Sequence, residues 1–308
     1  MNVTIAICTW NRAELLDLTL AEIRKFKIPD GLGWELLVVN NNCSDETESV
    51  IARHAEVLPI TRVFEGQPGV AHARNCALTH AKSDWIIWID DDVLVDPDWL
   101  LAFSRTVTQY PDAAVIGGPI APWFPFEPDP DLFAAFAPLQ RGFCGLDYGP
   151  EHQSLDNKGL YCANMAVHLA RTAGLKFDTD CGRVQNFQGG EEDLNFVRAV
   201  RARGERVIWS PKMRVRHYVD PKRMTVEYMD RWFNDLGEWT VRREGVPEGA
   251  QLFGVPRWLL RRYLTSAASA IGARLTFRRV AYLKARQEWS HARGTLRECR
   301  VVRQKRAS

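Results

Sequence analysis

Short apolar runs alternate with helix-patterned segments through the N-terminal half of the chain. The runs are rich in β-branched and aromatic residues, which is typical of strands buried on both faces of a parallel sheet. The predicted strands cover residues 3–8, 35–39, 60–64, 85–89 and 114–117. The predicted helices cover residues 13–26, a segment that begins near residue 46, and residues 70–80 and 97–110. This alternation predicts right-handed crossovers and an α/β fold around a mostly parallel sheet.

The pattern becomes less regular after residue 117. Residues 117–138 contain six prolines with aromatic side chains among them, which predicts a loop packed over one edge of the sheet. Further predicted elements are strands at 160–167, 206–209 and 213–218, and a helix from about 192 to 203 that Gly204 ends. From about Thr225 the pattern is helical and basic. The sequence therefore predicts an α/β domain over residues 1–224 and a helical extension over 225–308.

Composition places the chain among ordinary globular proteins. It has 308 residues, of which 46% are hydrophobic and 25% charged. Its seven cysteines are scattered and contain no C-x-x-C pair, which argues against a disulfide framework or a zinc ribbon and fits a reducing compartment. No signal-peptide pattern and no apolar run of about 18 residues occurs. These observations predict a cytoplasmic protein.

The net charge of +2 hides an uneven distribution. Residues 257–308 contain 14 Lys or Arg and two acidic residues, a net charge of +12, so the preceding residues carry −10. Large apolar residues are interleaved with these cations over two predicted helices. Such a basic amphipathic segment is typical of peripheral attachment to a membrane surface, here the inner face. A solvated helical hairpin packed on the α/β domain is the alternative, and the sequence leaves both open.

Three consecutive aspartates follow the buried strand at 85–89. Ligands of open α/β sheets bind outside the carboxyl ends of the strands, where Asp90, Asp91 and Asp92 lie. Oxygen ligands suit a hard cation such as Mg²⁺ or Mn²⁺. The strand period directs Asp90 and Asp92 to one side and Asp91 to the other. The simpler interpretation is a solvated acidic turn.

Other polar clusters follow the strands at the same edge of the predicted sheet. Thr9, Asn11 and Arg12 follow the first strand, and residues 40–45 follow the second. Ser44 or Asp45 can instead cap the next helix, with Glu48 placed as in a capping box. Neither a G-x-G-x-x-G nor a G-x-x-x-x-G-K-[ST] motif occurs, so a Rossmann dinucleotide site and a P-loop lack support.

Two features in the later part of the chain are candidates for catalysis or metal binding. Glu191, Glu192 and Asp193 stand at a helix start, where a carboxylate can act as a general base or simply complement the helix dipole. His217 lies in a short predicted strand, as a metal ligand or as a structural histidine.

These segments resemble family 2 glycosyltransferases of the GT-A fold, of the bacterial cell-surface polysaccharide type. The resemblance covers about residues 1–220 and rests on motifs that occur in the family's order: VTIAICTWNR, ELLVVNNNCSDET, GVAHARNCAL, WIIWIDDDV, YCANMAV and GGEEDLNF. It implies inverting transfer of a sugar from a nucleotide-diphosphate donor to a hydroxyl acceptor, with Mg²⁺ or Mn²⁺ bound at the donor diphosphate.

The resemblance also implies roles for individual residues. The implied donor-binding residues are Thr9, Asn11, Arg12, Asn40, Asn42, Arg74, Asp90 and Asn164. The implied metal ligands are Asp90, Asp92 and His217. The implied catalytic pair is Asp193, as the base, with Glu192; the register leaves Glu191 and Glu192 as alternatives for the base.

Two departures from the family pattern affect specificity. Asn40 replaces the usual aspartate, and because its amide can still pair with a uracil edge, a UDP-sugar is the expected donor. Cys162 stands where glycine is common, which reshapes the predicted acceptor pocket. The expected acceptor is a glycan or a lipid-linked glycan.

Two rival functions remain open at the level of sequence. A sugar nucleotidyltransferase would need a Gly-rich basic loop after the first strand, where residues 9–12 are not one. A nucleic-acid-binding protein would use the basic extension and would bind with steep salt dependence. The acidic motifs argue against it, so no nucleic acid is expected.

Overall fold

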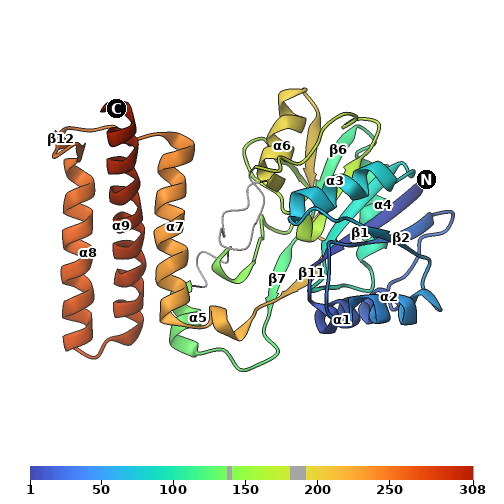
Figure 1. The fold of residues 1–308 in the computed structure, drawn as a ribbon, viewed down its shortest axis with the longest axis horizontal. Coiled ribbons are helices and arrows are strands. Elements are labelled where there is room, and N and C mark those ends of the chain that lie inside the picture. The colour runs from blue at the N-terminus through green and yellow to red at the C-terminus, as the bar shows by residue number, and fades with distance from the viewer. Residues whose placement is uncertain (137–140, 181–191, 308) are drawn as a thin grey trace. The chain divides into compact units, whose positions relative to one another are not determined.

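The computed structural model describes residues 1–136, 141–180 and 192–307, and the chain divides into two compact units (Figure 1). The first unit comprises residues 1–123 and 144–218, and the second comprises residues 124–143 and 219–308. The domain boundary between residues 224 and 225 stays a prediction. Among the described helices, none combines the length and the apolar character needed to cross a membrane.

An eight-stranded sheet forms the centre of the first unit. Its strands are β1 (Asn2–Thr9), β2 (Gly33–Asn40), β3 (Ile60–Phe64), β4 (Trp85–Asp90), β6 (Ala113–Gly117), β8 (Gln153–Ser154), β9 (Met165–His168) and β10 (Arg206–Trp209). The order across the sheet is β3-β2-β1-β4-β9-β6-β10-β8. β1 pairs in parallel with β2 and β4, whereas β9 pairs antiparallel with both β4 and β6. The predicted α/β class with a mostly parallel sheet is confirmed.

Helices flank this sheet and follow the predicted pattern. They are α1 (Ala13–Ile23), α2 (Thr47–Ala55), α3 (Val70–His80), α4 (Trp99–Gln109) and α6 (Glu192–Ala202). The residues of β4 from Trp85 to Ile89 are all buried, as expected for a central strand with both faces covered. α1 ends at Ile23 rather than at Phe26, and the backbone N–H of Lys27 instead bonds to the carbonyl of Pro97 at 2.8 Å.

A small three-stranded sheet lies at the end of β4. It contains β5 (Val93–Val95), β7 (Ile120–Trp123) and β11 (Val215–Tyr218), in the order β5-β11-β7. β11 runs antiparallel to β5, with His217 opposite Val93. This register brings a residue from late in the chain beside the three aspartates.

The prediction of a loop over residues 117–138 is wrong in part. β7 occupies its beginning, and α5 (Pro130–Phe136) lies near its end. α5 starts where it does because Pro130 suits the first turn of a helix and Oδ1 of Asp129 accepts hydrogen bonds from the next free backbone N–H groups.

The predicted strand at 160–167 is also corrected. Residues Cys162–Asn164 form a 3₁₀ turn, and the strand β9 begins only at Met165. Asn164 therefore precedes the strand instead of lying within it. The physical reason is that the backbone N–H of Asn164 bonds to the carbonyl of Tyr161 at 3.0 Å, which closes a turn at this point instead of pairing with a neighbouring strand.

Long helices make up most of the second unit. They are α7 (Val226–Glu244), α8 (Arg257–Leu275) and α9 (Arg279–Ala307), and α9 packs against α5, α7 and α8. The hydroxyl of Thr225 accepts a hydrogen bond from the backbone N–H of Tyr228 and so caps α7. A short hairpin, β12 (Gln251–Leu252) with β13 (Val255–Pro256), precedes α8, and no strand was predicted in this region.

Candidate active site

The strand order reverses at β1, which lies between β2 and β4. Cys8 near the end of β1 is in register with Asp90 at the end of β4. Polar residues that follow these three strands therefore meet at one edge. Such a switch point is where open α/β sheets bind ligands.

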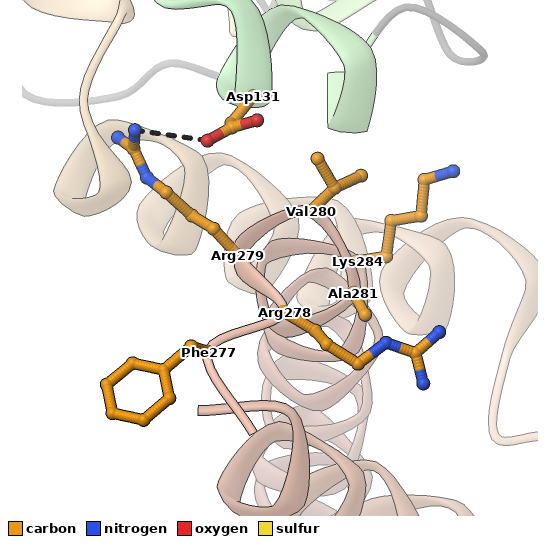
Figure 2. Close-up of a pocket in the computed structure, with 7 residues that line it drawn as sticks. All are labelled: Asp131, Phe277, Arg278, Arg279, Val280, Ala281 and Lys284. Atoms are coloured by element: carbon orange, nitrogen blue, oxygen red, sulfur yellow. Dashed lines mark hydrogen bonds and ion pairs between the residues drawn. The ribbon is translucent and has the colours of Figure 1, made fainter. Parts of the chain in front are cut away.

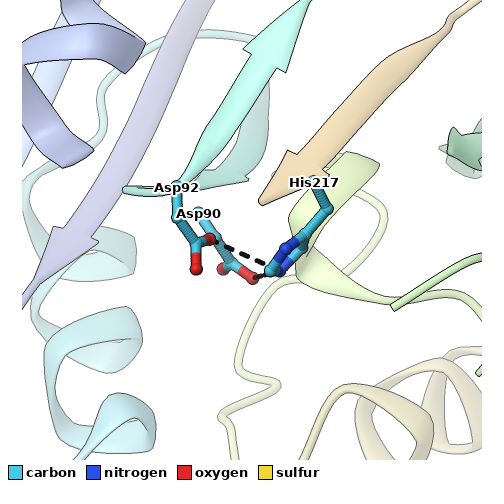
Figure 3. Close-up of side chains that lie close together, drawn as sticks. All are labelled: Asp90, Asp92 and His217. Carbon is cyan, nitrogen blue, oxygen red and sulfur yellow. Dashed lines mark ion pairs between the residues drawn. The ribbon is translucent and has the colours of Figure 1, made fainter. Parts of the chain in front are cut away.

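Asp90, Asp92 and His217 lie together at this edge (Figure 3). Their ligand atoms all lie within 4.8 Å of one another. Nε2 of His217 is 3.3 Å from Oδ1 of Asp92 and 3.6 Å from Oδ2 of Asp90. Asp90 ends β4, Asp92 lies just before β5, and His217 belongs to β11, so the pairing of β11 with β5 assembles the cluster.

The cluster fits a divalent cation on two observations. Oδ1 of Asp92 is buried and accepts no hydrogen bond within the described part of the chain. Nδ1 of His217 lies 2.8 Å from the carbonyl oxygen of Tyr218, so this nitrogen donates and Nε2 faces the carboxylates. Metal-bound histidines are commonly oriented in this way.

The charge balance of the cluster also favours a bound cation. Burial alone would lower the pKa of His217, but the carboxylate of Asp92, with that of Asp90, holds this pKa well above its ordinary value of 6.5. The two carboxylates thus favour positive charge at this position. A divalent cation would supply that charge and would bind the neutral form of His217, because the ligand form of histidine is neutral.

Asp91 is held outside this cluster by Thr9, the last residue of β1, and by Arg12, which follows that strand. The hydroxyl of Thr9 donates to Oδ2 of Asp91 at 2.8 Å, and Nη1 of Arg12 lies 3.1 Å from Oδ1. Arg12 also donates to Oδ2 of Asp92 at 2.7 Å. Burial, and then the charge of Asp92, raise the pKa of Asp91 to about 7. Thr9 and Arg12, which were predicted to bind the donor, therefore contact the acidic residues.

Arg74 of α3 joins the aspartates to a second acidic pair. Its guanidinium lies 2.7 Å from Oε1 of Glu192, 3.1 Å from Oδ1 of Asp193 and 3.6 Å from Oδ1 of Asp90. It also stacks over the ring of Phe177 at 5.5 Å. A single buried cation thus compensates carboxylates from two distant parts of the chain.

Glu192 and Asp193 occupy the first turn of α6 and have different surroundings. Oδ2 of Asp193 accepts a hydrogen bond from the backbone N–H of Cys162 at 2.9 Å. Oε2 of Glu192 is buried without a hydrogen-bond partner among the described residues. Burial, and then the charge of Asp193, raise the pKa of Glu192 to about 7. Glu191, the alternative base, lies outside the described residues.

Asn40 at the end of β2 is buried and fully engaged by its neighbours. Its Oδ1 accepts a hydrogen bond from the backbone N–H of Cys43 at 2.7 Å, and its amide donates to Glu48. Arg62 of β3 pairs with Glu48 in turn. Glu48 therefore does not close a capping box, and that prediction is wrong. The role of Asn40 toward a base stays a prediction.

Asn11 and Asn42 are exposed residues in the neighbouring loops. Both have left-handed backbone conformations, with φ of 51° and 61°, which asparagine tolerates better than most residues. Oδ1 of Asn11 accepts a hydrogen bond from the backbone N–H of Ser44 at 2.7 Å, so the loops after β1 and β2 are joined.

Asn164 lies inside the protein rather than at an open surface. Its Oδ1 accepts a hydrogen bond from Nε1 of Trp99 at 2.9 Å. Its Nδ2 donates to the carbonyls of Pro119 and Met213, at 3.0 and 2.7 Å. The side chain thus holds together four segments near the site.

Two residues near the site, Asp45 and Asn41, make contacts that the sequence did not predict. Asp45 accepts hydrogen bonds from the backbone N–H groups of Ala13 and Thr47, the first residues of α1 and α2. Asn41 donates to two carbonyls of residues 65–67 and accepts from the backbone N–H of Gly69, just before α3. The polar run at residues 40–45 indicated that these side chains have a role, but it did not reveal which backbone groups they bind.

Sequence comparisons relate this chain to known proteins. Residues 4–122 match the sequence model described as Glycosyl transferase family 2. The succinoglycan biosynthesis protein ExoM of Rhizobium meliloti (strain 1021) is 23% identical over 238 residues, which cover 74% of this chain and 71% of that protein. The glucosyl-dolichyl phosphate glucuronosyltransferase of Haloferax volcanii is 24% identical over 233 residues, 70% and 69% of the two chains.

A solved structure shares the fold. The mannosyltransferase PcManGT from Pyrobaculum calidifontis, in complex with GDP-Man and Mn²⁺, superposes with a TM-score of 0.57 at 22% identity. The match covers 97% of this chain and 86% of that one. The GT-A fold predicted from the motifs is thereby confirmed.

Proposed function

We propose that this protein is an inverting, metal-dependent glycosyltransferase of family 2, because residues 4–122 match the sequence model of that family and the chain shares the fold of PcManGT. It moves a sugar from a nucleotide-diphosphate donor to an acceptor hydroxyl during assembly of a cell-surface glycan. The observation that carries the proposal is the buried Arg74, whose guanidinium joins Asp90 of the cation-compatible cluster to the acidic pair of α6.

Asp193 acts as the general base in this proposal. It takes the proton of the acceptor hydroxyl as the oxygen attacks the anomeric carbon, and the bond to the nucleoside diphosphate breaks on the opposite face. One displacement at that carbon inverts its configuration. The backbone N–H of Cys162 and the guanidinium of Arg74 orient the carboxylate.

Asp90, Asp92 and His217 would hold the divalent cation, Mg²⁺ or Mn²⁺. When bound, the cation compensates the negative charge that develops on the departing diphosphate. Thr9 and Arg12 orient the acidic residues through Asp91. The residues at the ends of β1 and β2, including Asn11, Asn40 and Asn42, would face the nucleoside.

The proposed donor is a UDP-sugar. A guanosine donor is the alternative, in view of the GDP-Man in the PcManGT complex. A lipid-linked glycan is the proposed acceptor, and the printed name of the Haloferax relative, which acts on a glucosyl-dolichyl phosphate, supports it. We also propose a cytoplasmic location, since the six cysteines in the described residues are free thiols. A place at the inner membrane face would suit a lipid-linked acceptor.

A thermal-shift panel of nucleoside diphosphates, each with Mn²⁺ and with chelator, tests the proposal. We expect one nucleotide to raise the Tm in the presence of Mn²⁺ and chelator to remove that effect. A ligand at 100 times its Kd stabilises a folded protein by about 2.7 kcal/mol, which is readily measured.

Two variants complete this experiment. Asp92→Asn should abolish the metal-dependent shift, whereas Asp112→Asn, a matched change at an exposed aspartate that precedes β6 and pairs with Arg206, should retain it. If no nucleotide stabilises the unaltered protein, or if Asp92→Asn responds normally, the proposed donor site is wrong.

A further inference from the structure

An exposed apolar stripe runs along α8 in the second unit. Leu264, Ile271 and Leu275 are 64, 62 and 73% exposed, and Ala268 between them is also exposed. Steps of three and four residues place these side chains on one face of a helix. Phe277 follows in the turn to α9 with 94% of its surface exposed. Large apolar side chains gathered in this way on one face mark an interaction surface.

The rest of α8 is already occupied by packing within its unit. Its buried residues are Leu259, Ser266 and Ala270, which lie on another face, and α8 packs extensively against α9 (Figure 1). The apolar stripe is therefore not the face that holds the helix to its neighbour. The apolar side chains of the stripe are exposed to water, which is unfavourable, and no contact within the second unit accounts for their position on the helix.

Exposed cations accompany the stripe. They are Arg257, Arg261, Arg274, Arg278 and Lys284, and within the described part of the chain none of them forms an ion pair. α8 itself contains no acidic residue. Figure 2 shows the contrast at the turn: Arg279 reaches Asp131, whereas Arg278 and Lys284 extend away from that pair. Phe277, Arg278 and Lys284 line a surface hollow there.

The charge of this surface distinguishes between its candidate occupants. A second copy packed face to face on α8 would bring arginines against arginines, with no acid on the helix to compensate them. An anionic lipid surface complements the cations and also accepts the apolar side chains. We propose that α8 and the α8–α9 turn, the α8 surface, bind an anionic lipid bilayer. Phe277 and Leu275 enter its apolar region, and the arginines contact the headgroups.

This inference goes beyond the transferase reaction, and neither its argument nor its test depends on that reaction. The test is flotation of the full-length protein with vesicles of phosphatidylcholine alone or mixed with phosphatidylglycerol, without nucleotide or metal. We expect binding to the mixed vesicles that declines with added salt, and little binding to the neutral ones.

Paired variants separate the two contributions. Leu275→Ser/Phe277→Ser should reduce the partition coefficient more than about ten-fold. Arg274→Ser/Arg278→Ser should reduce it about 25-fold on anionic vesicles only, since each cation contributes about five-fold. Leu18→Ser and Lys82→Ser, exposed positions of the first unit, are the matched controls and should bind like the unaltered protein.

Three results would overturn the inference. The first is the absence of binding of the unaltered protein to anionic vesicles. The second is binding that both pairs of variants leave unchanged. The third is light scattering that shows a dimer which Leu264→Ser/Ile271→Ser dissociates while vesicle binding persists, because the α8 surface would then belong to a second copy. Circular dichroism of each variant establishes that the exposed substitutions leave the fold intact.

Discussion

Arg74 shows why single residues of this site cannot be judged in isolation. It is buried, and its guanidinium meets carboxylates of Asp90, Glu192 and Asp193. An unpaired buried charge is strongly destabilising, so removing either side of this cluster would leave the other uncompensated. Substitutions that preserve the size and the hydrogen bonds of the side chain are therefore the ones that can test its role in the site.

Asp193→Asn is the first such variant. We expect kcat to fall about 10²- to 10⁴-fold, because an amide cannot accept the acceptor proton, while the nucleotide-induced shift in Tm is retained. Oδ1 of the new asparagine can still accept the hydrogen bond from Cys162. Glu192→Gln is the matched control and should stay within about ten-fold of the unaltered rate. An active Asp193→Asn protein together with an inactive Glu192→Gln protein would assign the base to Glu192.

Glu192 also predicts a pH dependence of stability. Its pKa is about 7 in the folded protein and near 4.5 when exposed, so the folded state binds the extra proton between these values. The contribution of Glu192 is therefore fully present below pH 4.5 and is lost as the pH rises through 7. Glu192→Gln removes it. Denaturant unfolding from pH 4 to 8 should show the unaltered protein losing stability relative to Glu192→Gln; parallel pH profiles would contradict this prediction.

At the level of elements, two glycines set the contact between α7 and α9. A Cβ at Gly294 would lie 1.9 Å from the carbonyl oxygen of Asn234, and one at Gly237 would lie 2.2 Å from that of His291. The backbones of α7 and α9 thus approach each other closely at Gly237 and Gly294, because neither glycine has a side chain. This close packing explains why α9 associates so closely with α7 although its sequence is strongly basic.

Gly294→Ala should therefore destabilise the second unit, although alanine favours helices in general. We expect a loss of about 1–3 kcal/mol in the free energy of unfolding, as for other overpacked sites. Gly272→Ala in α8 is the control, since a Cβ there meets nothing within 4 Å, and it should be neutral or stabilising by up to about 1 kcal/mol. Thermal unfolding of both variants measures the difference, and equal Tm values would show that the helices adjust freely.

At the scale of the whole molecule, the second unit is built from two separate stretches of sequence. Leu132, Phe136 and Phe143 come from the middle of the chain and share an apolar cluster with Phe233 and Leu283 of the C-terminal helices. The C-terminal helices are thus not an appendage that can be removed without consequence. The proline-rich middle of the chain depends on them for burial.

Truncation at residue 224 tests this dependence. We expect the 1–224 chain to bind an apolar dye and to aggregate, because Leu132 and Phe136 lose the side chains that cover them. Light scattering and dye fluorescence measure both effects. The same truncation with Leu132→Ser and Phe136→Ser should aggregate less. A monomeric 1–224 chain that binds no dye would contradict this dependence.

The sequence by itself determined the features that depend on a short window of residues. The buried run at 85–89, the helix starts after polar loops and the three aspartates at a strand end are local patterns, and the structure confirms the α/β fold that they predict. The motifs in their order also resembled the family whose sequence model matches residues 4–122. Period, capping and turn chemistry are encoded within a few residues, which is why they could be read directly.

Only the tertiary structure decided how these pieces combine. Arg74 and Glu192 are 118 residues apart, and no local pattern relates them. His217 reaches Asp92 because β11 pairs with β5 in one register, and a shift by one residue would turn its side chain to the other face. Contacts of this kind depend on how sheets and helices pack. The sequence therefore shows which charged residues are present, and the tertiary structure determines which of them contact one another.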